Sequence, residues 1–217
     1  MNQPESRESL SRKEREKRVR QQEILKAARA LFVTKGFRET TLDEVARSAE
    51  FGKGTLYHYF ANKEDLFIGI IEQAVDETML IARESMAAPG DLRDKLRLYA
   101  RMIIQYTKEN GELLHILYHE LHRSDTPTDS AKLRECIQRA RGSWEILAEP
   151  FAKAVQDGTV RDFDPEQLAV LFDALLRGYC FHRFTVERSS VDEDLSTAAE
   201  LITAVFFDGI AEGKGKG

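Results

Sequence analysis

The sequence predicts an all-α protein with a small N-terminal head and a larger C-terminal helical body. Apolar residues recur at helical spacing nearly everywhere, and no convincing run alternates polar and apolar residues as a strand does. Capping residues and breaks containing Gly or Pro divide this pattern into about nine helices. Charge separates the two parts as well. Residues 1–63 contain 14 Lys and Arg against 9 Asp and Glu, whereas the whole chain has a formal net charge of −5.

Composition excludes several classes of protein. The chain has 217 residues, of which 42% are hydrophobic, so it has ample material for a buried core. No apolar run approaches the roughly 18–20 residues that span a bilayer, and the polar, charged N-terminus does not read as a secretory signal. Cys136 and Cys180 lie far apart among apolar residues, which favours buried inert thiols over a disulfide or a redox sensor. We therefore expect a soluble cytoplasmic protein.

Residues 1–19 are expected to form a flexible basic arm. Arginines and lysines crowd this segment, but Glu8, Glu14 and Glu16 are interleaved with them. Two interpretations stay open: a solvated tail, or an arm that contacts the backbone of a polyanion.

The head, residues 20–67, is expected to contain three short helices and the start of a fourth. The first covers about 18–35 and ends at Gly36, and the second covers about 42–49. Thr41 and Glu44 form a capping box at the start of the second helix. The third covers about 53–60, and the fourth begins after the N-cap candidate Asn62 and continues to about residue 86.

The stretch "FGKGTLYHYFANKEDL", residues 51–66, predicts a helix-turn-helix whose third helix faces nucleic acid. Leu56 and Phe60 are four residues apart, so their packing into the head would turn the opposite side of this helix outward. Gly54 lets the backbone approach a ligand, and helix N-termini next to Thr41 and Lys63 suit phosphate oxygens. The alternative is an ordinary surface helix with solvated charges. The residues turned outward are Lys53, Thr55, Tyr57, His58 and Tyr59.

The segment "ILKAARALFVTKGFRETTLDEVARSAEFGKGTLYHYFANKEDLF" resembles the N-terminal domain of the tetracycline-repressor (TetR) family of bacterial regulators. The resemblance covers about residues 20–67. It rests on the phenylalanine and Lys-Gly that close the first helix, on Thr-Thr-Leu at the start of the second, and on Gly-Thr-Leu-Tyr leading to Phe60 and Lys63. The family usually has glycine where this chain has Glu50, and a small polar residue where it has Gly52. A left-handed Glu50 would cost on the order of 1 kcal/mol relative to glycine.

The resemblance implies a dimer in which each third helix enters the major groove of double-stranded DNA. It also implies that residues 68–217 form a helical domain that binds a small-molecule effector and pairs with its copy through the last two helices. The residues that would contact DNA are Thr41, Lys53, Gly54, Thr55, Tyr57, His58, Tyr59 and Lys63.

The body is predicted to contain helices at about 92–109, 111–123, 130–157, 165–187 and 193–212, with Pro150 kinking or splitting the third of these. Two wide apolar stripes near the C-terminus suit a four-helix dimer interface, although the core of a monomer would look the same. The first stripe contains Leu168, Leu171, Phe172, Leu175, Leu176 and Tyr179, and the second contains Leu201, Ile202, Val205 and Phe206.

One helix of the body carries three histidines on one face. His115, His119 and His122 are spaced so that imidazoles could share a divalent metal ion, with Glu112 or Glu120 as further ligands. The alternative is a partly exposed helix side, or a pocket wall beside a separate core-facing stripe of Leu114, Leu117, Tyr118 and Leu121. Aromatic and sulfur-containing side chains could also line an apolar cavity, although such residues more often simply fill a core: Met102, Tyr106, Trp144 and Phe151.

The sequence thus predicts a DNA-binding regulator, most simply a repressor released from a pseudo-palindromic operator by an effector. A constitutive or metal-responsive regulator that uses the histidine face is the alternative. An enzyme is not expected, because the chain lacks a nucleophile elbow, a phosphate loop and a paired-carboxylate constellation. A helical adaptor that binds protein through its acidic body would leave the Lys/Tyr/His cluster unexplained.

Overall fold

The computed structural model describes residues 11–121, 131–186 and 195–210, and its regular secondary structure there is helical, which confirms the all-α prediction. The chain divides into two compact units, Met1–Ile70 and Ile71–Gly217, close to the 67/68 boundary expected from the sequence. Within the described ranges, no helix combines the length and the apolar character that a membrane crossing requires.

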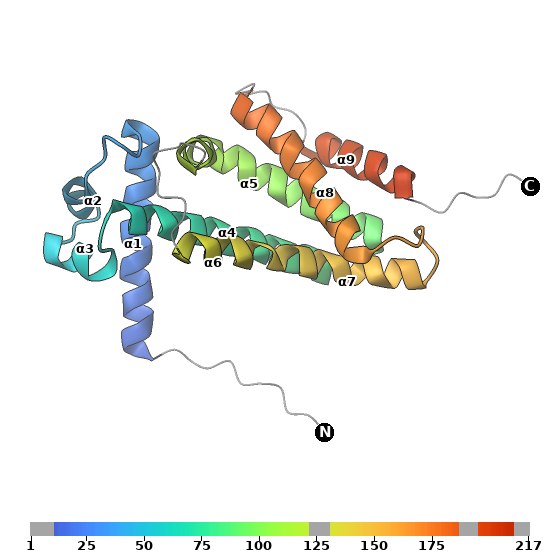
Figure 1. The fold of residues 1–217 in the computed structure, drawn as a ribbon, viewed down its shortest axis with the longest axis horizontal. Helices are drawn as coiled ribbons and strands as arrows, with labels where there is room; N and C mark the ends of the chain where they lie inside the picture. Colours follow the sequence, from blue (N-terminus) through green and yellow to red (C-terminus); the bar gives the residue numbers. More distant parts are fainter. Residues whose placement is uncertain (1–10, 122–130, 187–194, 211–217) are drawn as a thin grey trace, which may run out of the picture. The chain divides into compact units, whose positions relative to one another are not determined.

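The first unit contains α1 (Arg12–Lys35), α2 (Leu42–Ser48), α3 (Lys53–Tyr59) and the start of α4 (Lys63–Ala87). Helix α2 packs against α1, and α3 packs against α2 (Figure 1). The expected capping box starts α2. The backbone N–H of Glu44 donates to Thr41 Oγ1 at 3.3 Å, and the N–H of Thr41 donates to Glu44 Oε2 at 2.9 Å. These bonds satisfy two of the N–H groups that a helix start leaves without an intrahelical partner.

The expectation of a flexible arm over residues 1–19 is wrong for its second half, because α1 already begins at Arg12. Ser11 and Glu14 form a second capping box, in which Ser11 N donates to Glu14 Oε2 at 2.8 Å. Arg12 and Glu16, four residues apart, form an ion pair at 2.9 Å. The interleaved glutamates therefore cap and brace the helix instead of merely diluting the charge of an arm. Residues 1–10 lie outside the described residues.

The core of the first unit holds α3 in place. Leu56 on α3 is fully buried, and Phe60, which follows that helix, is 4% exposed. A Cβ on Gly69 would lie 3.0 Å from the Phe60 ring, so the glycine lets α4 pack closely against this ring. Because both anchors are enclosed, α3 cannot rotate without exposing one of them. The other buried apolar residues of this core include Ile24, Leu25, Ala28, Phe32, Phe37, Val45, Ala46, Leu66 and Phe67.

The turn between α2 and α3 places Glu50 in the left-handed region, with φ of 59°, as expected for a position where the TetR family usually has glycine. Glu50 N donates to Arg47 O at 3.1 Å, and Phe51 N donates to Ala46 O at 2.9 Å. This pair of bonds is the Schellman motif, which requires a left-handed residue after the helix. Gly52 has ordinary extended torsions, so the strain stays at Glu50.

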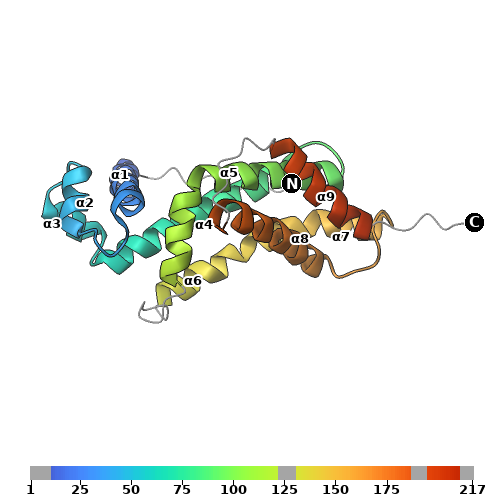
Figure 2. The same cartoon turned by 90° about the horizontal axis from the view of Figure 1, so that it is seen from above.

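The second unit consists of the rest of α4 together with α5 (Leu92–Leu121), α6 (Ala131–Ala140), α7 (Gly142–Gln156), α8 (Pro165–Cys180), a π-helical turn (Phe181–Val186) and α9 (Leu195–Ile210). Helix α7 packs along α8, and α5 packs against α9, as the two ribbon views show (Figures 1 and 2). Their shared core includes fully buried Tyr99, Leu147, Phe151 and Phe172.

Three helix boundaries differ from the prediction. The expected break before residue 111 is absent, because Gly111 lies inside the continuous α5, whose following turns bury Leu113 and Leu117. The helix expected over 130–157 splits at Arg141 instead of Pro150, which α7 contains. A Cβ on Gly142 would lie 3.1 Å from Met79 Cε, so the break falls where the backbone comes close to α4. The single helix expected over 165–187 becomes π-helical after Cys180.

The wide apolar stripe of α8 has two sides with different environments. Leu168, Phe172 and Leu176 are buried in the core, whereas Leu171 and Leu175 remain 59% and 42% exposed. On α9, Ile202 is buried, but two further large side chains are exposed to solvent: Leu201 is 57% exposed and Val205 is 61% exposed. We call Leu171, Leu175, Leu201 and Val205 the α8–α9 patch.

We expect the Glu50→Gly variant to be more stable than the parent chain. Glycine adopts the left-handed region without the penalty of about 1–2 kcal/mol that a Cβ brings, although it adds entropy to the unfolded chain. The net gain in the free energy of unfolding should be about 0.5–1 kcal/mol, measured by chemical denaturation. Glu50→Ala is the matched control and should bring no such gain. Equal stability of the two variants would show that Glu50 is not strained.

Candidate nucleic-acid interface and interior pocket

The outward side of α3 carries the polar and aromatic residues predicted to face nucleic acid. Tyr57 is 52% exposed, His58 is also exposed, and Thr55 and Tyr59 are half-buried. The rings of His58 and Tyr59 meet edge to face with centroids 5.4 Å apart. A Cβ on Gly54 would meet nothing within 4 Å, so the backbone there is open to close approach.

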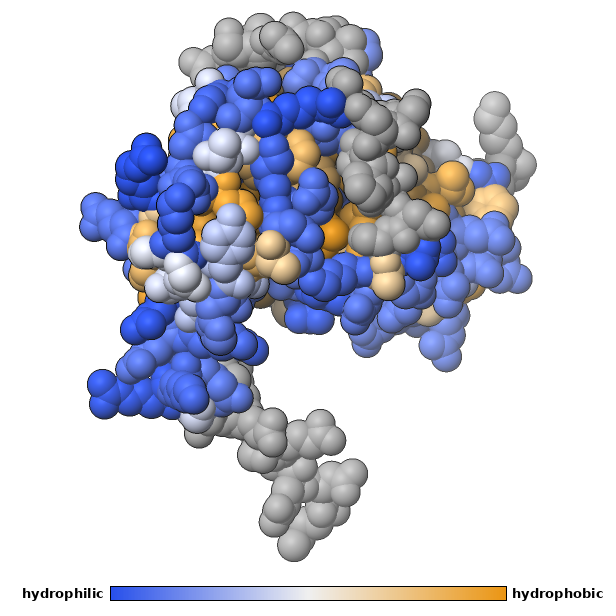
Figure 3. Space-filling model, turned by 60° about the vertical axis from the view of Figure 1, so that its left-hand side comes forward, coloured by the Kyte–Doolittle hydropathy of each residue, from blue (hydrophilic) through white to orange (hydrophobic). Residues whose placement is uncertain are grey.

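The first turns of α1 extend this side of α3 into a shallow groove. Lys13, Lys17 and Arg20 recur on one face of α1 and are exposed. They line a cavity of about 520 Å³ together with Glu16, Gly54, Thr55, His58 and Tyr59. In Figure 3 these turns of α1, next to the grey N-terminal residues at the bottom, are predominantly hydrophilic. The sequence prediction missed this partnership because it placed residues 12–19 in an arm. We call Lys13, Lys17 and Arg20 the basic face of α1.

Three of the predicted contact residues already have partners within the protein. Lys53 forms an ion pair with Asp43 on α2. Lys63 donates to Arg38 O at 2.8 Å, and its ammonium lies 4.7 Å from the centroid of the Phe37 ring. These two lysines therefore fix the neighbouring turns in addition to presenting positive charge.

The third such residue is Thr41, whose hydroxyl donates to Glu44 Oε2 at 2.8 Å. The Lys35 side chain, followed by the backbone and hydroxyl of Thr41, lowers the pKa of the Glu44 carboxyl to about 2. Glu44 is thus ionised at neutral pH and accepts the hydrogen bonds from Thr41 that cap the start of α2.

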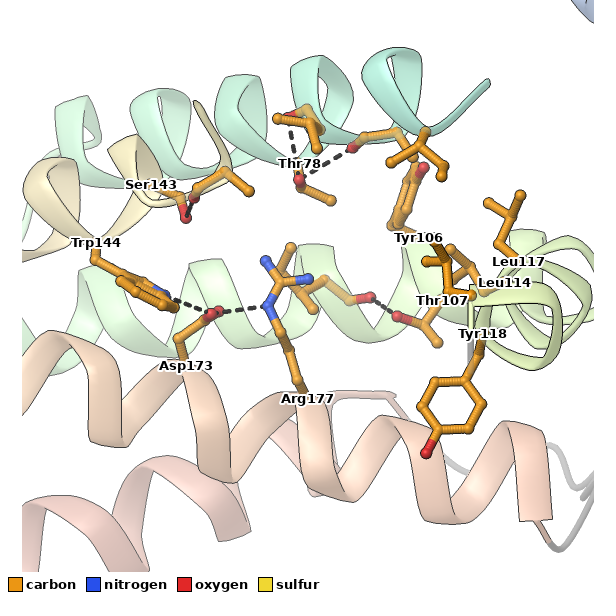
Figure 4. Close-up of a pocket in the computed structure, with 16 residues that line it drawn as sticks. Thr78, Tyr106, Thr107, Leu114, Leu117, Tyr118, Ser143, Trp144, Asp173 and Arg177 are labelled. Carbon is orange, nitrogen blue, oxygen red and sulfur yellow. Dashed lines mark hydrogen bonds and ion pairs between the residues drawn. The ribbon is translucent and has the colours of Figure 1, made fainter. Parts of the chain in front are cut away.

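The second unit contains a separate apolar pocket of about 350 Å³ between α4, α5, the end of α6, α7 and α8 (Figure 4). The predicted core-facing stripe of α5 forms one wall, and Tyr106 and Trp144 also line the cavity. Met102 lies at a different surface hollow, and Phe151 is fully buried. The lining residues are Ile71, Ala74, Val75, Thr78, Ile103, Tyr106, Thr107, Leu114, Leu117, Tyr118, Leu121, Ala140, Ser143, Trp144, Asp173 and Arg177.

A buried carboxylate organises one end of this pocket. Asp173 is 2% exposed and accepts three hydrogen bonds: from Tyr99 Oη at 2.7 Å, from Trp144 Nε1 at 2.9 Å and from Arg177 Nε at 2.8 Å. Burial raises the pKa of the Tyr99 phenol, so this hydroxyl stays a donor. Sequence reasoning missed Asp173 and Arg177. The available signal was a pair of opposite charges four residues apart within an apolar helix stripe.

The histidine face of α5 is only partly described. The rings of His115 and His119 lie with centroids 4.2 Å apart, while His122 lies outside the described residues. Within the described part of the chain, no three His, Cys, Asp or Glu side chains come together in a group that could hold a metal ion. Metal binding by His115, His119 and His122 therefore stays a prediction.

The two cysteines are buried free thiols in the described structure. Burial raises the pKa of Cys136, and it raises the pKa of Cys180 to about 11. Both thiols are therefore protonated at neutral pH, which supports the expectation that they are inert.

Comparisons with known proteins identify similar sequences and structures. Residues 24–70 match the family described as bacterial regulatory proteins, tetR family. The chain is similar to YhgD, an uncharacterized HTH-type transcriptional regulator of Bacillus subtilis (strain 168), with 26% identity over 87% of this chain and 95% of YhgD. It is also 26% identical to the transcriptional repressor KstR2 of Rhodococcus jostii (strain RHA1), over 88% of this chain and 91% of KstR2.

A solved structure has the same fold. The transcriptional regulator FadR from Bacillus subtilis, in complex with stearoyl-CoA, superposes with a TM-score of 0.71 at 19% identity, covering 87% of this chain and 98% of FadR. The similar proteins are transcriptional regulators and not enzymes. The match at the helix-turn-helix and the relatives that are similar over most of the chain support the TetR family of DNA-binding transcriptional regulators, and the solved structure shares its two-part helical fold.

Proposed function

We propose that the chain is a repressor that binds a pseudo-palindromic DNA operator as a dimer and leaves it when a small molecule occupies the interior pocket. The observation that carries this proposal is the fixed orientation of α3. Leu56 and Phe60 are buried, while Tyr57 and His58 remain exposed on the opposite side. A helix held in this way presents a constant set of side chains to the major groove. We expect the protein to act in the cytoplasm.

Direct contacts to DNA are proposed for the predicted set on α2, α3 and α4. Tyr57, His58 and Tyr59 have the reach to contact bases or phosphates, and Gly54 allows the backbone to approach a phosphate. Thr41, Lys53 and Lys63 would act partly by holding the helix starts in place, since each already has a partner. Thr55 borders the groove shared with α1.

The basic face of α1 is proposed to follow the phosphate backbone beside the recognition helix. Lys13, Lys17 and Arg20 form no ion pair with another described residue, and the groove that they share with α3 suits a strand of phosphates. Contacts of this kind provide affinity and position but no sequence preference.

Dimerisation is proposed to occur through the α8–α9 patch. Its four side chains are large, apolar and at least 42% exposed, and α8 and α9 lie side by side (Figure 1). Covering such a patch with its own copy would bury it in a symmetric interface. Two copies of α3 would then read two related half-sites.

Effector control is proposed to operate through the interior pocket. Its volume of about 350 Å³ and its mainly apolar wall fit a small ligand. FadR, which has a similar fold, was solved with stearoyl-CoA, and KstR2 is a repressor. One conformation of the dimer would bind both half-sites, and another would not. A ligand that binds the second conformation more tightly would shift the population away from DNA, by an amount set by the difference between its affinities for the two conformations.

Tyr57→Ala should lower operator affinity roughly 5- to 150-fold, which corresponds to about 1–3 kcal/mol for the loss of a base or backbone contact. Affinity can be measured by fluorescence anisotropy on a duplex selected by the protein from random DNA. The fold should be unaffected, since Tyr57 is 52% exposed. Val33→Ala, an apolar truncation on the surface of α1, is the control and should bind normally. Normal binding by Tyr57→Ala would remove this tyrosine from the interface.

Lys17→Ala should reduce the salt dependence of DNA binding. Each lost phosphate contact lowers the slope of log K against log salt by about 0.9, so a dimer that loses two should change by about two. Lys26→Ala is the matched control, because Lys26 is exposed and lies two and a half turns further along α1, on its opposite side. If the two variants have the same slope, the basic face does not touch phosphates.

Leu171→Glu should convert the dimer into a monomer with the chain mass of 24.8 kDa, measured by light scattering after size exclusion. A charge in the centre of an apolar interface is left without a partner, whereas the free monomer tolerates it on a site that is 59% exposed. Leu80→Glu, at a site 53% exposed on α4, is the control and should leave the mass unchanged. A Leu171→Glu dimer would place the interface elsewhere.

A further inference from the structure

The interior pocket offers a ligand very few polar groups. Of its lining residues, only Asp173 and Arg177 carry a charge. Four lining hydroxyls donate their hydrogen within the protein: Thr78 to Ala74 O at 3.0 Å, Tyr106 to Glu77 Oε2 at 2.8 Å, Thr107 to Ile103 O at 2.8 Å, and Ser143 to Ala140 O at 2.7 Å. These hydroxyls therefore have no hydrogen left to donate to a ligand.

Asp173 is likewise occupied by the protein. Its carboxylate accepts hydrogen bonds from Tyr99, Trp144 and Arg177, which leaves little of its acceptor capacity for a ligand. The same bond fixes Arg177, because the guanidinium is held at Nε and cannot swing away from the pocket without breaking it.

Arg177 is the charged donor among the lining residues. Its Nε donates a hydrogen bond to Asp173, and the guanidinium also interacts with the Tyr99 hydroxyl. The side chain lines the cavity and remains 45% exposed. Figure 4 shows its terminal nitrogens directed from α8 into the space below α4. Burial lowers the pKa of Arg177, but its interactions with Asp173 and Tyr99 together more than offset this, so the overall pKa is raised and the group stays charged.

A ligand that fills this pocket must replace the water around these N–H groups with an acceptor of its own. A hydrocarbon would leave them without hydrogen bonds, and an amine would set donors and positive charge against the guanidinium. A planar oxygen acceptor matches the planar arrangement of the guanidinium N–H groups of Arg177. The rest of the pocket wall favours a ligand that is otherwise apolar.

We propose that the pocket selects apolar molecules that end in a planar carbonyl-type oxygen acceptor, with Arg177 as the residue that recognises this head group. This proposal rests on the function proposed above, in which the pocket is the effector site. A carboxylate and an ester share this chemistry. Because Asp173 already balances the charge of Arg177, the acceptor oxygen, and not a negative charge, is the feature that the site requires.

Three ten-carbon probes test the proposal by calorimetry on the full chain: decanoate, methyl decanoate and decylamine. We expect both oxygen-bearing probes to bind at least tenfold more tightly than decylamine, and their ratio distinguishes a charged head from a neutral one. Equal binding of decylamine, or no binding of either oxygen-bearing probe, would overturn the proposal.

Variants assign the preference to Arg177. Arg177→Met should reduce the discrimination against decylamine by tenfold or more. Because this change leaves Asp173 buried without its cation, the double variant Asp173→Asn with Arg177→Met keeps the test valid if the single variant fails to fold. Arg83→Met is the matched control and should bind all three probes like the parent, because Arg83 is an exposed arginine of α4 that does not line the pocket. Unchanged discrimination in the double variant would contradict the role of Arg177.

DNA binding by the same preparations, without any probe, separates this proposal from the proposed function. If the parent chain binds its selected duplex in a salt-dependent way but shows no preference among the probes, the head-group proposal alone fails. If it binds no DNA yet prefers the oxygen-bearing probes, the repressor proposal fails while the chemistry of the pocket stands.

Discussion

Burial of Leu56 and Phe60 is the constraint on which the nucleic-acid interface depends. The two side chains are 0% and 4% exposed, and rotating α3 would bring one of them into water. Fully burying a side chain of this size is worth about 1.5–3 kcal/mol, which exceeds any single contact that a rotated helix would gain at the surface. The positions of Tyr57 and His58 follow from this packing and need no contacts of their own.

The buried carboxylate of Asp173 has the corresponding position in the second unit. Removing a charge from water costs several kcal/mol, and the attraction of a partner charge often fails to recover that cost. Here Tyr99 and Trp144 donate to Asp173 as well, so its burial is compensated by three hydrogen bonds. Two apolar residues would fill the same space at less cost, and would leave the cavity without a donor.

The sequence predicted the elements of the first unit well because their signals are local. The Thr41–Glu44 capping box, the spacing of Leu56 and Phe60, and the left-handed Glu50 depend on residues within a few positions of one another. The α1–α3 groove and the Asp173 network depend on residues distant along the chain, so local patterns did not contain them. Boundaries failed where tertiary packing overrides propensity, as it does along α5 and at the break before α7.

Helix α8 shows how one stripe of sequence can serve three environments. Within its 16 residues, Phe172 and the residues four before and four after it face the core. Asp173 and Arg177 lie about 100° to one side of that face, in the pocket, and Leu171 and Leu175 lie about 100° to the other side, in the exposed patch. Ligand and partner would therefore bind opposite flanks of one rigid helix. A ligand that shifts or rotates α8 against the core necessarily displaces the patch, and linkage then requires that dimer geometry alter ligand affinity by the same factor.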